Sequence, residues 1–242
     1  MTARQPIGFF GMLRTWLGIS RPTPVVYTDD RFHSQIPRDG LRVVFEVGAR
    51  HGDESSALAA MLPEAIIHSF ECNPMTIEAC RSRLSTITNV RFHGHALGSS
   101  EESRTFYPFT SDNNPGSSSF LRRVDADRTQ DARGTTIEIR TAKTVMEESG
   151  LKAVDLLCMD VQGFELEVLK GFGDRLADVR FVLMEEPALR PDRKYLPEGS
   201  HSKYLEAPDQ SAIRTFMTSN GFRELVRLPE NKIEDNVLYG RA

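Results

Sequence analysis

Three short motifs combine carboxylates and glycines in spacings that could bind a nucleotide-like ligand. The first runs from Glu46 to Gly52 (EVGARHG) and follows a short run of β-branched and aromatic residues. Glycine permits turns that other residues disfavour, and it lets the backbone approach a ligand closely. Parallel α/β sheets bind cofactors in a crevice at the carboxyl ends of their strands. We therefore expect this turn to line such a crevice, although the motif alone is also typical of an ordinary strand-to-helix turn.

The second motif, FECNP, places Glu71 19 residues after Gly52. An acidic residue about 20 positions beyond a glycine-rich turn is placed to accept hydrogen bonds from two ribose hydroxyls. A carboxylate suits this role because it has two acceptor oxygens and no donor. The spacing favours a nucleotide-like ligand over a solvated carboxylate at this position.

The third motif is DLLCMDVQGFE, residues 155–165. A buried strand ends at Asp160, and the chain then turns through Gly163 into a helix. We expect Asp160 to lie at the same crevice as the other two motifs. Glu165 has a structural interpretation at least as good as a catalytic one, because a carboxylate in the first turn of a helix is favourable.

The elements that must position these motifs alternate between strand and helix patterns, which predicts a parallel sheet covered on both faces. We expect strands at 42–47, 65–70, 90–93, 95–97, 136–141, 154–160, 180–185, 223–228 and 236–240, with a break at Gly94 in the third and an edge segment at 103–109. We expect helices at 55–61, 75–84, 145–149, 165–172 and 209–219. The short link between the last two strands indicates an antiparallel hairpin, and residues 110–134 read as a long polar loop.

The first 40 residues differ from the rest. Residues 7–19 (IGFFGMLRTWLGI) are apolar, but Arg14 interrupts them and no small-residue cleavage site follows, which argues against a secretory signal. We expect a helix that packs on the domain or covers a substrate cleft, and the alternative is an interfacial helix with peripheral membrane contact. Residues 21–40 resemble a connecting arm. The predicted division is an N-terminal segment and arm at 1–40 and one domain at 41–242.

Composition excludes several classes of protein. The formal net charge of −4 gives no surface suited to neutralising phosphates, so nucleic acid is not an expected partner. The three cysteines are odd in number and show no CxxC spacing, so neither a disulfide framework nor a zinc site is expected. Reduced thiols favour a cytoplasmic location.

Together the motifs resemble the FkbM-type methyltransferases, within the Rossmann-like enzymes that use S-adenosylmethionine. The resemblance is carried in order by FEVGARHG, FECNP, ALGSSEE, SSSF, LLCMDVQGFELEVLKGF and FVLMEE, at 45–52, 70–74, 96–102, 117–120, 156–172 and 181–186. The segment at 156–172 is the most specific. The resemblance implies a Rossmann-like class I methyltransferase fold, a doubly wound α/β domain whose seven-stranded, mostly parallel sheet has an antiparallel last strand.

The resemblance also implies S-adenosylmethionine as cofactor and S-adenosylhomocysteine as product. The residues expected to bind the cofactor are Glu46, Gly48, Ala49, Arg50, His51, Gly52, Glu71, Cys72, Ala96 and Asp160. Two positions depart from the family, which commonly has Asp in place of Glu46 and Asn in place of Arg50. Glu46 keeps the charge. An inward Arg50 could pair with the methionine carboxylate or with Glu46, whereas an outward one would have no such role.

Methyl transfer from a sulfonium is an in-line displacement, so the protein mainly supplies position and orientation. A hydroxyl acceptor also needs a base within hydrogen-bond reach. The catalytic candidates are Asp160 first and then His201, which lies in the polar loop 186–207. The candidates for binding the acceptor are Gln162, Glu185, Tyr195 and Lys203. The resemblance implies O-methylation of a small molecule, a sugar, glycolipid or specialised metabolite, and the sequence identifies neither the acceptor nor the oligomeric state.

Three alternatives remain open. Carboxylates at Asp160, Glu185 and Glu186 could hold Mg²⁺, but their spacing is not diagnostic and no metal is expected. A nicotinamide-dependent oxidoreductase would also use an acidic ribose ligand, but it would favour a G-x-G-x-x-G turn, and this turn has only Gly48 and Gly52. A non-catalytic binding protein could retain the same fold.

Overall fold

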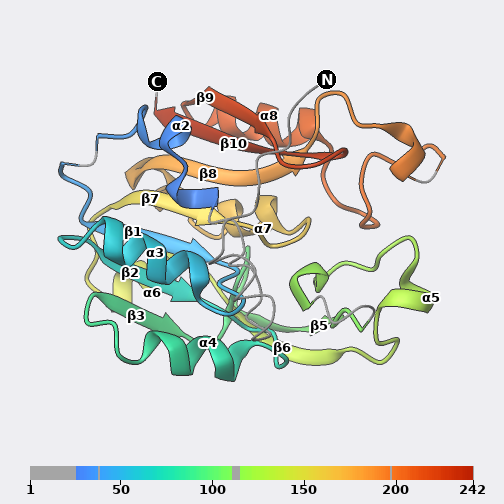
Figure 1. Cartoon of the computed structure of the whole chain (residues 1–242), viewed down its shortest axis with the longest axis horizontal. Coiled ribbons are helices and arrows are strands. Elements are labelled where there is room, and N and C mark those ends of the chain that lie inside the picture. Colours follow the sequence, from blue (N-terminus) through green and yellow to red (C-terminus); the bar gives the residue numbers. More distant parts are fainter. Residues whose placement is uncertain (1–25, 38, 111–114, 197, 242) are drawn as a thin grey trace, which may run out of the picture.

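A twisted seven-stranded sheet runs through the middle of the molecule, in the order β3-β2-β1-β7-β8-β10-β9 (Figure 1). The computed structural model describes residues 26–37, 39–110, 115–196 and 198–241. The strands of the sheet are β1 (Val43–Val47), β2 (Ile66–Phe70), β3 (Val90–His93), β7 (Val154–Met159), β8 (Val179–Pro187), β9 (Phe222–Pro229) and β10 (Glu234–Arg241).

Strand directions follow the predicted pattern. The strands β3, β2, β1, β7 and β8 pair in parallel, so their carboxyl ends meet at one edge. The last strand, β10, runs antiparallel to both β8 and β9. The central strand β7 is buried at every residue, as expected for a strand covered on both faces. The predicted doubly wound sheet with an antiparallel last strand and a terminal hairpin is confirmed.

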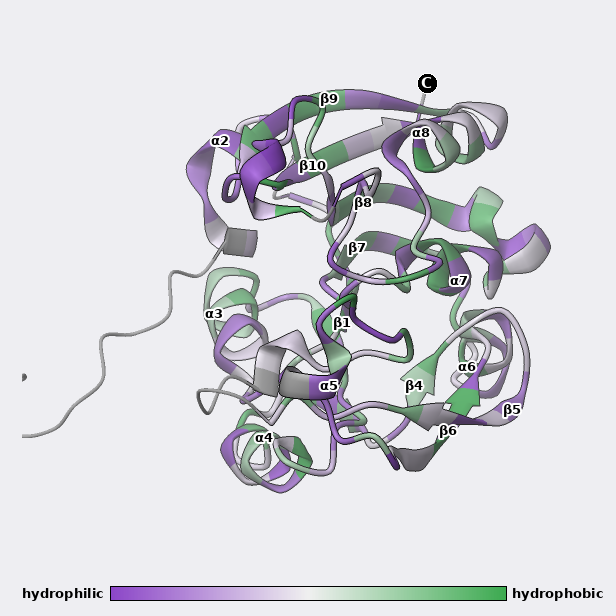
Figure 2. Ribbon diagram, turned by 90° about the vertical axis from the view of Figure 1, so that its right-hand side faces the viewer, coloured by the Kyte–Doolittle hydropathy of each residue, from purple (hydrophilic) through white to green (hydrophobic). Residues whose placement is uncertain are grey.

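Helices cover both faces of this sheet (Figure 2). They are α3 (Asp53–Met61) and α4 (Ile77–Leu84) on one face, and α6 (Ala142–Glu148), α7 (Glu165–Lys170) and α8 (Gln210–Ser219) on the other. Side chains alternate along β1, so Val44 packs into the core beneath α3 while Phe45 packs into the core on the opposite face. The two apolar cores therefore pack on opposite faces of the sheet and fix the position of the strand ends.

A small second sheet lies beside the main one. Its order is β4-β6-β5, from β4 (Ala96–Leu97), β6 (Thr135–Arg140) and β5 (Glu102–Phe106). The expectation that 95–97 resumes the third strand was wrong, because Ala96 and Leu97 leave the main sheet and pair in parallel with Ile139 and Arg140. The chain leaves the main sheet after β3, which is an edge strand. The pairing with β6 then supplies hydrogen-bond partners for the backbone of Ala96 and Leu97.

The shorter elements lie in the arm and the loops. They are η1 (Val26–Thr28), α2 (Asp30–His33), η2 (Pro115–Ser117), α5 (Ala126–Thr129), η3 (Gly173–Asp178) and η4 (Arg193–Tyr195). Tyr27, Phe32 and Ile36 pack into the same core as α3, so the described end of the arm is part of the packed domain. The apolar segment 7–19 lies outside the described residues. Among the described helices, none has the length and apolar character needed to cross a bilayer.

Candidate active site

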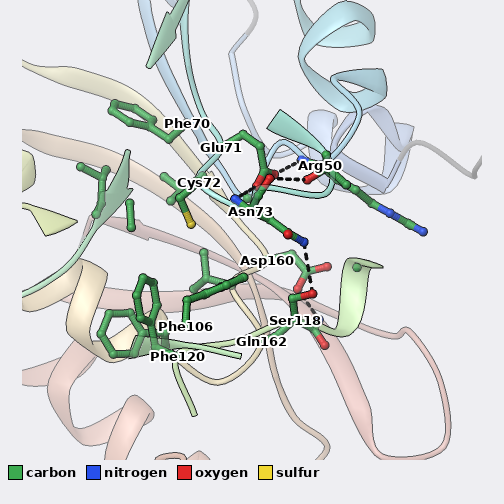
Figure 3. Close-up of a pocket in the computed structure, with 18 of the residues that line it drawn as sticks. Arg50, Phe70, Glu71, Cys72, Asn73, Phe106, Ser118, Phe120, Asp160 and Gln162 are labelled. Carbon is green, nitrogen blue, oxygen red and sulfur yellow. Dashed lines mark hydrogen bonds between the residues drawn. The ribbon is translucent and has the colours of Figure 1, made fainter. Parts of the chain in front are cut away.

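A cavity opens at the carboxyl ends of β1, β2 and β7 (Figure 3). We call it the first cavity. Its apolar walls are aromatic, and they are formed by Phe70, Phe106, Phe120 and Phe164. Polar groups enter it from Glu71 at the end of β2 and from the turn after β7. A largely apolar cavity with a few polar groups is typical of a small-molecule site.

The turn after β1 packs directly against the turn after β7. Gly48 has a φ of 93°, and a Cβ atom there would overlap the carbonyl oxygen of Asp160, so the position requires glycine. The Asp160 N–H also donates to the carbonyl of Val47 at 3.1 Å. Arg50 and Gln162 take positive φ values of 52° and 54° on these same two turns. Strained backbone of this kind gathers at functional sites.

Glu71 joins two of the motifs that the sequence singled out. Its carboxylate accepts hydrogen bonds from the backbone N–H groups of Arg50, at 2.5 Å, and Asn73, at 2.6 Å (Figure 3). Burial raises the pKa of Glu71 above its ordinary value, and these N–H donors oppose the rise. The Asn73 amide in turn donates to the hydroxyl of Ser118 at 3.1 Å, which ties the long loop to the cavity wall. The carboxylate is therefore held in place before any ligand binds.

A second cavity borders the first, and the two share Gly48, Arg50 and Asp160. This second cavity lies between the arm, the turn after β1, β8 and the β9–β10 hairpin. Its carboxyl groups come from Glu46, Asp53, Glu54, Asp160, Glu185 and Glu230. Arg50 contributes the one guanidinium among the described residues that line it. The second cavity is therefore strongly acidic, whereas the first is mainly aromatic.

Glu46 is fully buried on β1 at the floor of the second cavity. Its carboxyl group accepts hydrogen bonds from the hydroxyls of Ser55, at 2.5 Å, and Ser69, at 3.2 Å. Burial raises the pKa of Glu46 to about 8, against the lowering effect of the Ser55 hydroxyl. Glu46 is consequently largely protonated at neutral pH in this structure.

Asp160 follows β7, Glu185 lies on the neighbouring strand β8, and one amide joins the two carboxyl groups. The Gln162 Nε2 group donates to Asp160 Oδ1 at 2.5 Å and to Glu185 Oε2 at 3.1 Å. Burial raises the pKa of Glu185 well above its ordinary value, and the charge of Asp160 adds to the rise. Burial also raises the pKa of Asp160, and the hydrogen bond from Gln162 opposes the rise.

The structure brings nine of the ten predicted cofactor residues to the two cavities. The first cavity is lined by Gly48, Arg50, Glu71, Cys72, Ala96 and Asp160, and the second by Glu46, Gly48, Ala49, Arg50, His51 and Asp160. Gly52 lines neither, since it is buried at the N-cap position of α3. The Arg50 guanidinium lies against Gly116 of the long loop. The roles of these residues stay predictions.

The loop candidates lie elsewhere. His201 is exposed, its Nε2 is 2.8 Å from the carbonyl oxygen of Ala207, and it lines a third, smaller cavity beside Glu185. Lys203 forms an ion pair with Glu234 at 2.8 Å. The Tyr195 side chain is 53% exposed and lines neither cavity. Of the four acceptor candidates, Gln162 and Glu185 therefore lie at the cavities, while Lys203 and Tyr195 do not line them.

Sequence reasoning missed several lining residues. The aromatic walls come from Phe106, Phe120 and Phe164 in loops and in the small sheet, and Tyr27 comes from the arm. Asn73 lies inside the second motif, so its closeness to Glu71 in the sequence could have identified it as a lining residue. Within the described ranges, no group of three or more His, Cys, Asp or Glu side chains is arranged to hold a metal ion.

Comparison with known proteins identifies the family. The model of the methyltransferase FkbM domain matches residues 46–224, which is more than half of the chain. The chain belongs to the FkbM methyltransferase family. It is accordingly an S-adenosylmethionine-dependent methyltransferase, and the sheet order described above is that of a Rossmann-like methyltransferase.

Individual relatives of this FkbM methyltransferase are distant. It is 22% identical over 176 residues to the 2-O-methyltransferase NoeI of Sinorhizobium fredii, covering 69% of this chain and 72% of that protein. Among solved structures it is similar to a SAM-dependent methyltransferase from Aquifex aeolicus, with 12% identity, a TM-score of 0.49, and coverage of 88% and 89% of the two chains. It is also similar to the N-terminal domain of EvdMO1 with SAH and D-fucose, with 14% identity, a TM-score of 0.48, and coverage of 88% and 82%.

Proposed function

We propose that this enzyme moves the methyl group of S-adenosylmethionine to a hydroxyl of a small molecule, a sugar, a glycolipid or a specialised metabolite. The observation that carries this proposal is the shared wall of the two cavities at Gly48, Arg50 and Asp160. At this shared wall, a ligand in the first cavity can contact a ligand in the second. The name of the relative NoeI, a 2-O-methyltransferase, supports transfer to oxygen.

The residues of the first cavity fit the nucleoside half of the cofactor. Glu71 offers carboxylate oxygens to ribose hydroxyls, and the aromatic walls offer apolar contact to a ring. Gly48 lines both cavities, so its backbone can contact a ligand in either one. The acidic groups of the second cavity suit the positive charges of the methionine half and can accept hydrogen bonds from acceptor hydroxyls.

When bound, the cofactor supplies an activated methyl group, so the protein's own contribution is position and proton transfer. Asp160 lines both cavities and can hold the acceptor hydroxyl where they meet. Its carboxylate can also receive the hydroxyl proton, so the proposed reaction needs no metal ion. We propose a cytoplasmic location, in keeping with three cysteines that form no disulfide.

The test is a calorimetric titration of the full chain with S-adenosylhomocysteine and, separately, with NAD. We expect S-adenosylhomocysteine to bind at micromolar concentration and NAD not to bind. Glu71→Ala should weaken the binding of S-adenosylhomocysteine by about 100-fold, because two hydrogen bonds to a charged group are worth about 1.5 kcal/mol each. The control is Glu78→Ala on the exposed face of α4, which should bind like the parent. Preferential binding of NAD would refute the proposal and favour an oxidoreductase.

A further inference from the structure

Two carboxyl groups at the edge of the second cavity are held by a single amide. Asp160 follows β7 and Glu185 lies on the neighbouring parallel strand β8. The two hydrogens of the Gln162 Nε2 group point to one oxygen of each. Because the N–H directions of an amide diverge by about 120°, the two acceptor oxygens stand about 5 Å apart. Each carboxyl group keeps a second oxygen that Gln162 does not contact.

Gln162 is itself fixed on several sides. The Tyr204 hydroxyl donates to Gln162 Oε1 at 2.6 Å, and the Ser119 hydroxyl donates to the Gln162 carbonyl at 2.8 Å. Its backbone is held at a φ of 54°, which a side chain rarely adopts unless its surroundings impose it. The bond from Tyr204 to Oε1 leaves Nε2 to face the carboxyl groups. The strained turn therefore sets the orientation of the amide.

A third polar group faces the same cavity. The Tyr27 side chain lines the second cavity, and among the described residues none forms a hydrogen bond with its hydroxyl. A tyrosine hydroxyl that lines a cavity can donate one hydrogen bond to a ligand and accept another. Tyr27 therefore offers a hydrogen-bonding group to a ligand that also contacts the carboxyl groups.

We propose that Asp160 and Glu185 act as one proton-sharing pair that receives the proton of the acceptor hydroxyl, with Gln162 as the residue that positions both. This inference rests on the proposed function. The O–H proton passes to the ionised carboxyl group of the pair while the acceptor oxygen forms a bond to the methyl carbon. The carbon–sulfur bond breaks and its electron pair stays on sulfur, which leaves as an uncharged thioether. The other carboxyl group stays protonated throughout.

Electrostatics support the pairing. Two carboxylates this close oppose each other's ionisation, and such groups titrate as a unit in two steps. The pKa of Glu185 and that of Asp160 are both raised, first by burial. The charged or titratable groups that face the pair from the surrounding elements are Tyr27, Glu165, Lys203, Tyr204, Glu230 and Glu234. Lys203 favours ionisation, and the acidic groups oppose it.

The test is a pH titration of the carboxyl carbons of the full chain by ¹³C NMR, with the two signals assigned by their loss in Asp160→Asn and Glu185→Gln. We expect both signals of the parent to follow the same two steps. In Asp160→Asn the midpoint of Glu185 should fall by about one to two pH units, because the like charge of Asp160 is removed. In Gln162→Met both midpoints should rise, because the donor that favours the ionised forms is lost.

Glu230→Gln is the matched control. Glu230 lines the same cavity but receives no hydrogen bond from Gln162, so its removal should shift the midpoint of Glu185 clearly less than Asp160→Asn does. Independent one-step titrations, or a Glu185 midpoint that does not change in Asp160→Asn, would overturn the pairing. Calorimetry with S-adenosylhomocysteine on the same samples separates the two proposals. A parent that fails to bind it contradicts the proposed function, whereas a bound parent with independent titrations contradicts only the pair.

Discussion

The two cavities that meet at Gly48 are built in different ways. The described residues that line the first lie between positions 47 and 164, entirely inside the region that the family model matches. The second also needs Tyr27 before that region and Glu230 and Asn236 after it. The first has aromatic walls and one carboxylate fixed by backbone N–H groups, while the second is crowded with carboxyl groups. Shape and apolar contact therefore dominate one cavity, and charge and proton placement dominate the other.

The largest expected effect comes from removing the wall that the cavities share. Gly48→Ala adds a Cβ atom that overlaps the carbonyl oxygen of Asp160, in a backbone conformation already unfavourable for alanine. We expect it to lower the free energy of unfolding by about 4 kcal/mol and to abolish binding of S-adenosylhomocysteine. Thermal unfolding and calorimetry measure the two effects.

Gly40→Ala is the control for the backbone cost alone. Gly40 has a φ of 95°, close to that of Gly48, but an added Cβ atom would meet nothing within 4 Å. Its substitution should cost about 1 kcal/mol and leave binding intact. Equal losses in the two variants would mean that the contact between the turns does not hold the cavities together.

A second prediction concerns the acidic cavity. The pKa of Glu46 is raised to about 8 from an ordinary value of 4.5, so between these values the folded chain keeps a proton that the unfolded chain loses. The contribution of this carboxyl group to folding stability is fully present below pH 4.5, and it is lost as the pH rises through 8. Glu46→Gln replaces the carboxyl group by an uncharged amide that does not titrate. Between pH 5 and pH 8 the variant should lose about 3 kcal/mol less folding stability than the parent. Urea unfolding of both proteins at pH 5 and pH 8 gives the difference, and equal pH dependence would contradict a protonated Glu46.

The aromatic cavity should show the opposite dependence on pH, with a smaller effect. Behind its wall the His68 and His93 rings form a 3.0 Å hydrogen bond, and His93 stacks on Phe70 at 4.5 Å. Burial lowers the pKa of both histidines to about 4 from 6.5. Between these values the unfolded chain binds protons that the folded chain does not, so stability falls as pH falls from 6.5 to 4.

His68→Phe should make this acid loss shallower by about 1 kcal/mol per pH unit, because one of the two titrating rings is replaced by a ring that cannot be protonated. The measurement is the free energy of unfolding at pH 7.5 and at pH 5. The change between the two pH values is compared, so any cost of repacking cancels. A variant with the same acid slope as the parent would show that the ring pair titrates normally in the folded chain.

Sequence patterns predicted the main sheet and the position of its motifs because those features depend on local periodicity. The strand ending at Val47, the acidic Glu71 and the turn at Asp160 needed only the rule that parallel strands end at one edge. The small sheet was not predicted as a separate unit, because β4 has two residues and its pairing with β6 spans some 40 positions of sequence. Tyr27 was missed for the same reason, since only the folded chain brings the arm over β1.

The close packing of Gly48 on Asp160 has a thermodynamic consequence. One backbone contact forms part of both cavities, so a shift of either turn changes the shape of both sites. Affinities that depend on a common element are linked, and linkage is reciprocal. If the bound cofactor changes the affinity for the acceptor by some factor, the bound acceptor changes the affinity for the cofactor by the same factor. We therefore expect a true acceptor to change the affinity for S-adenosylhomocysteine, even before any turnover is detected.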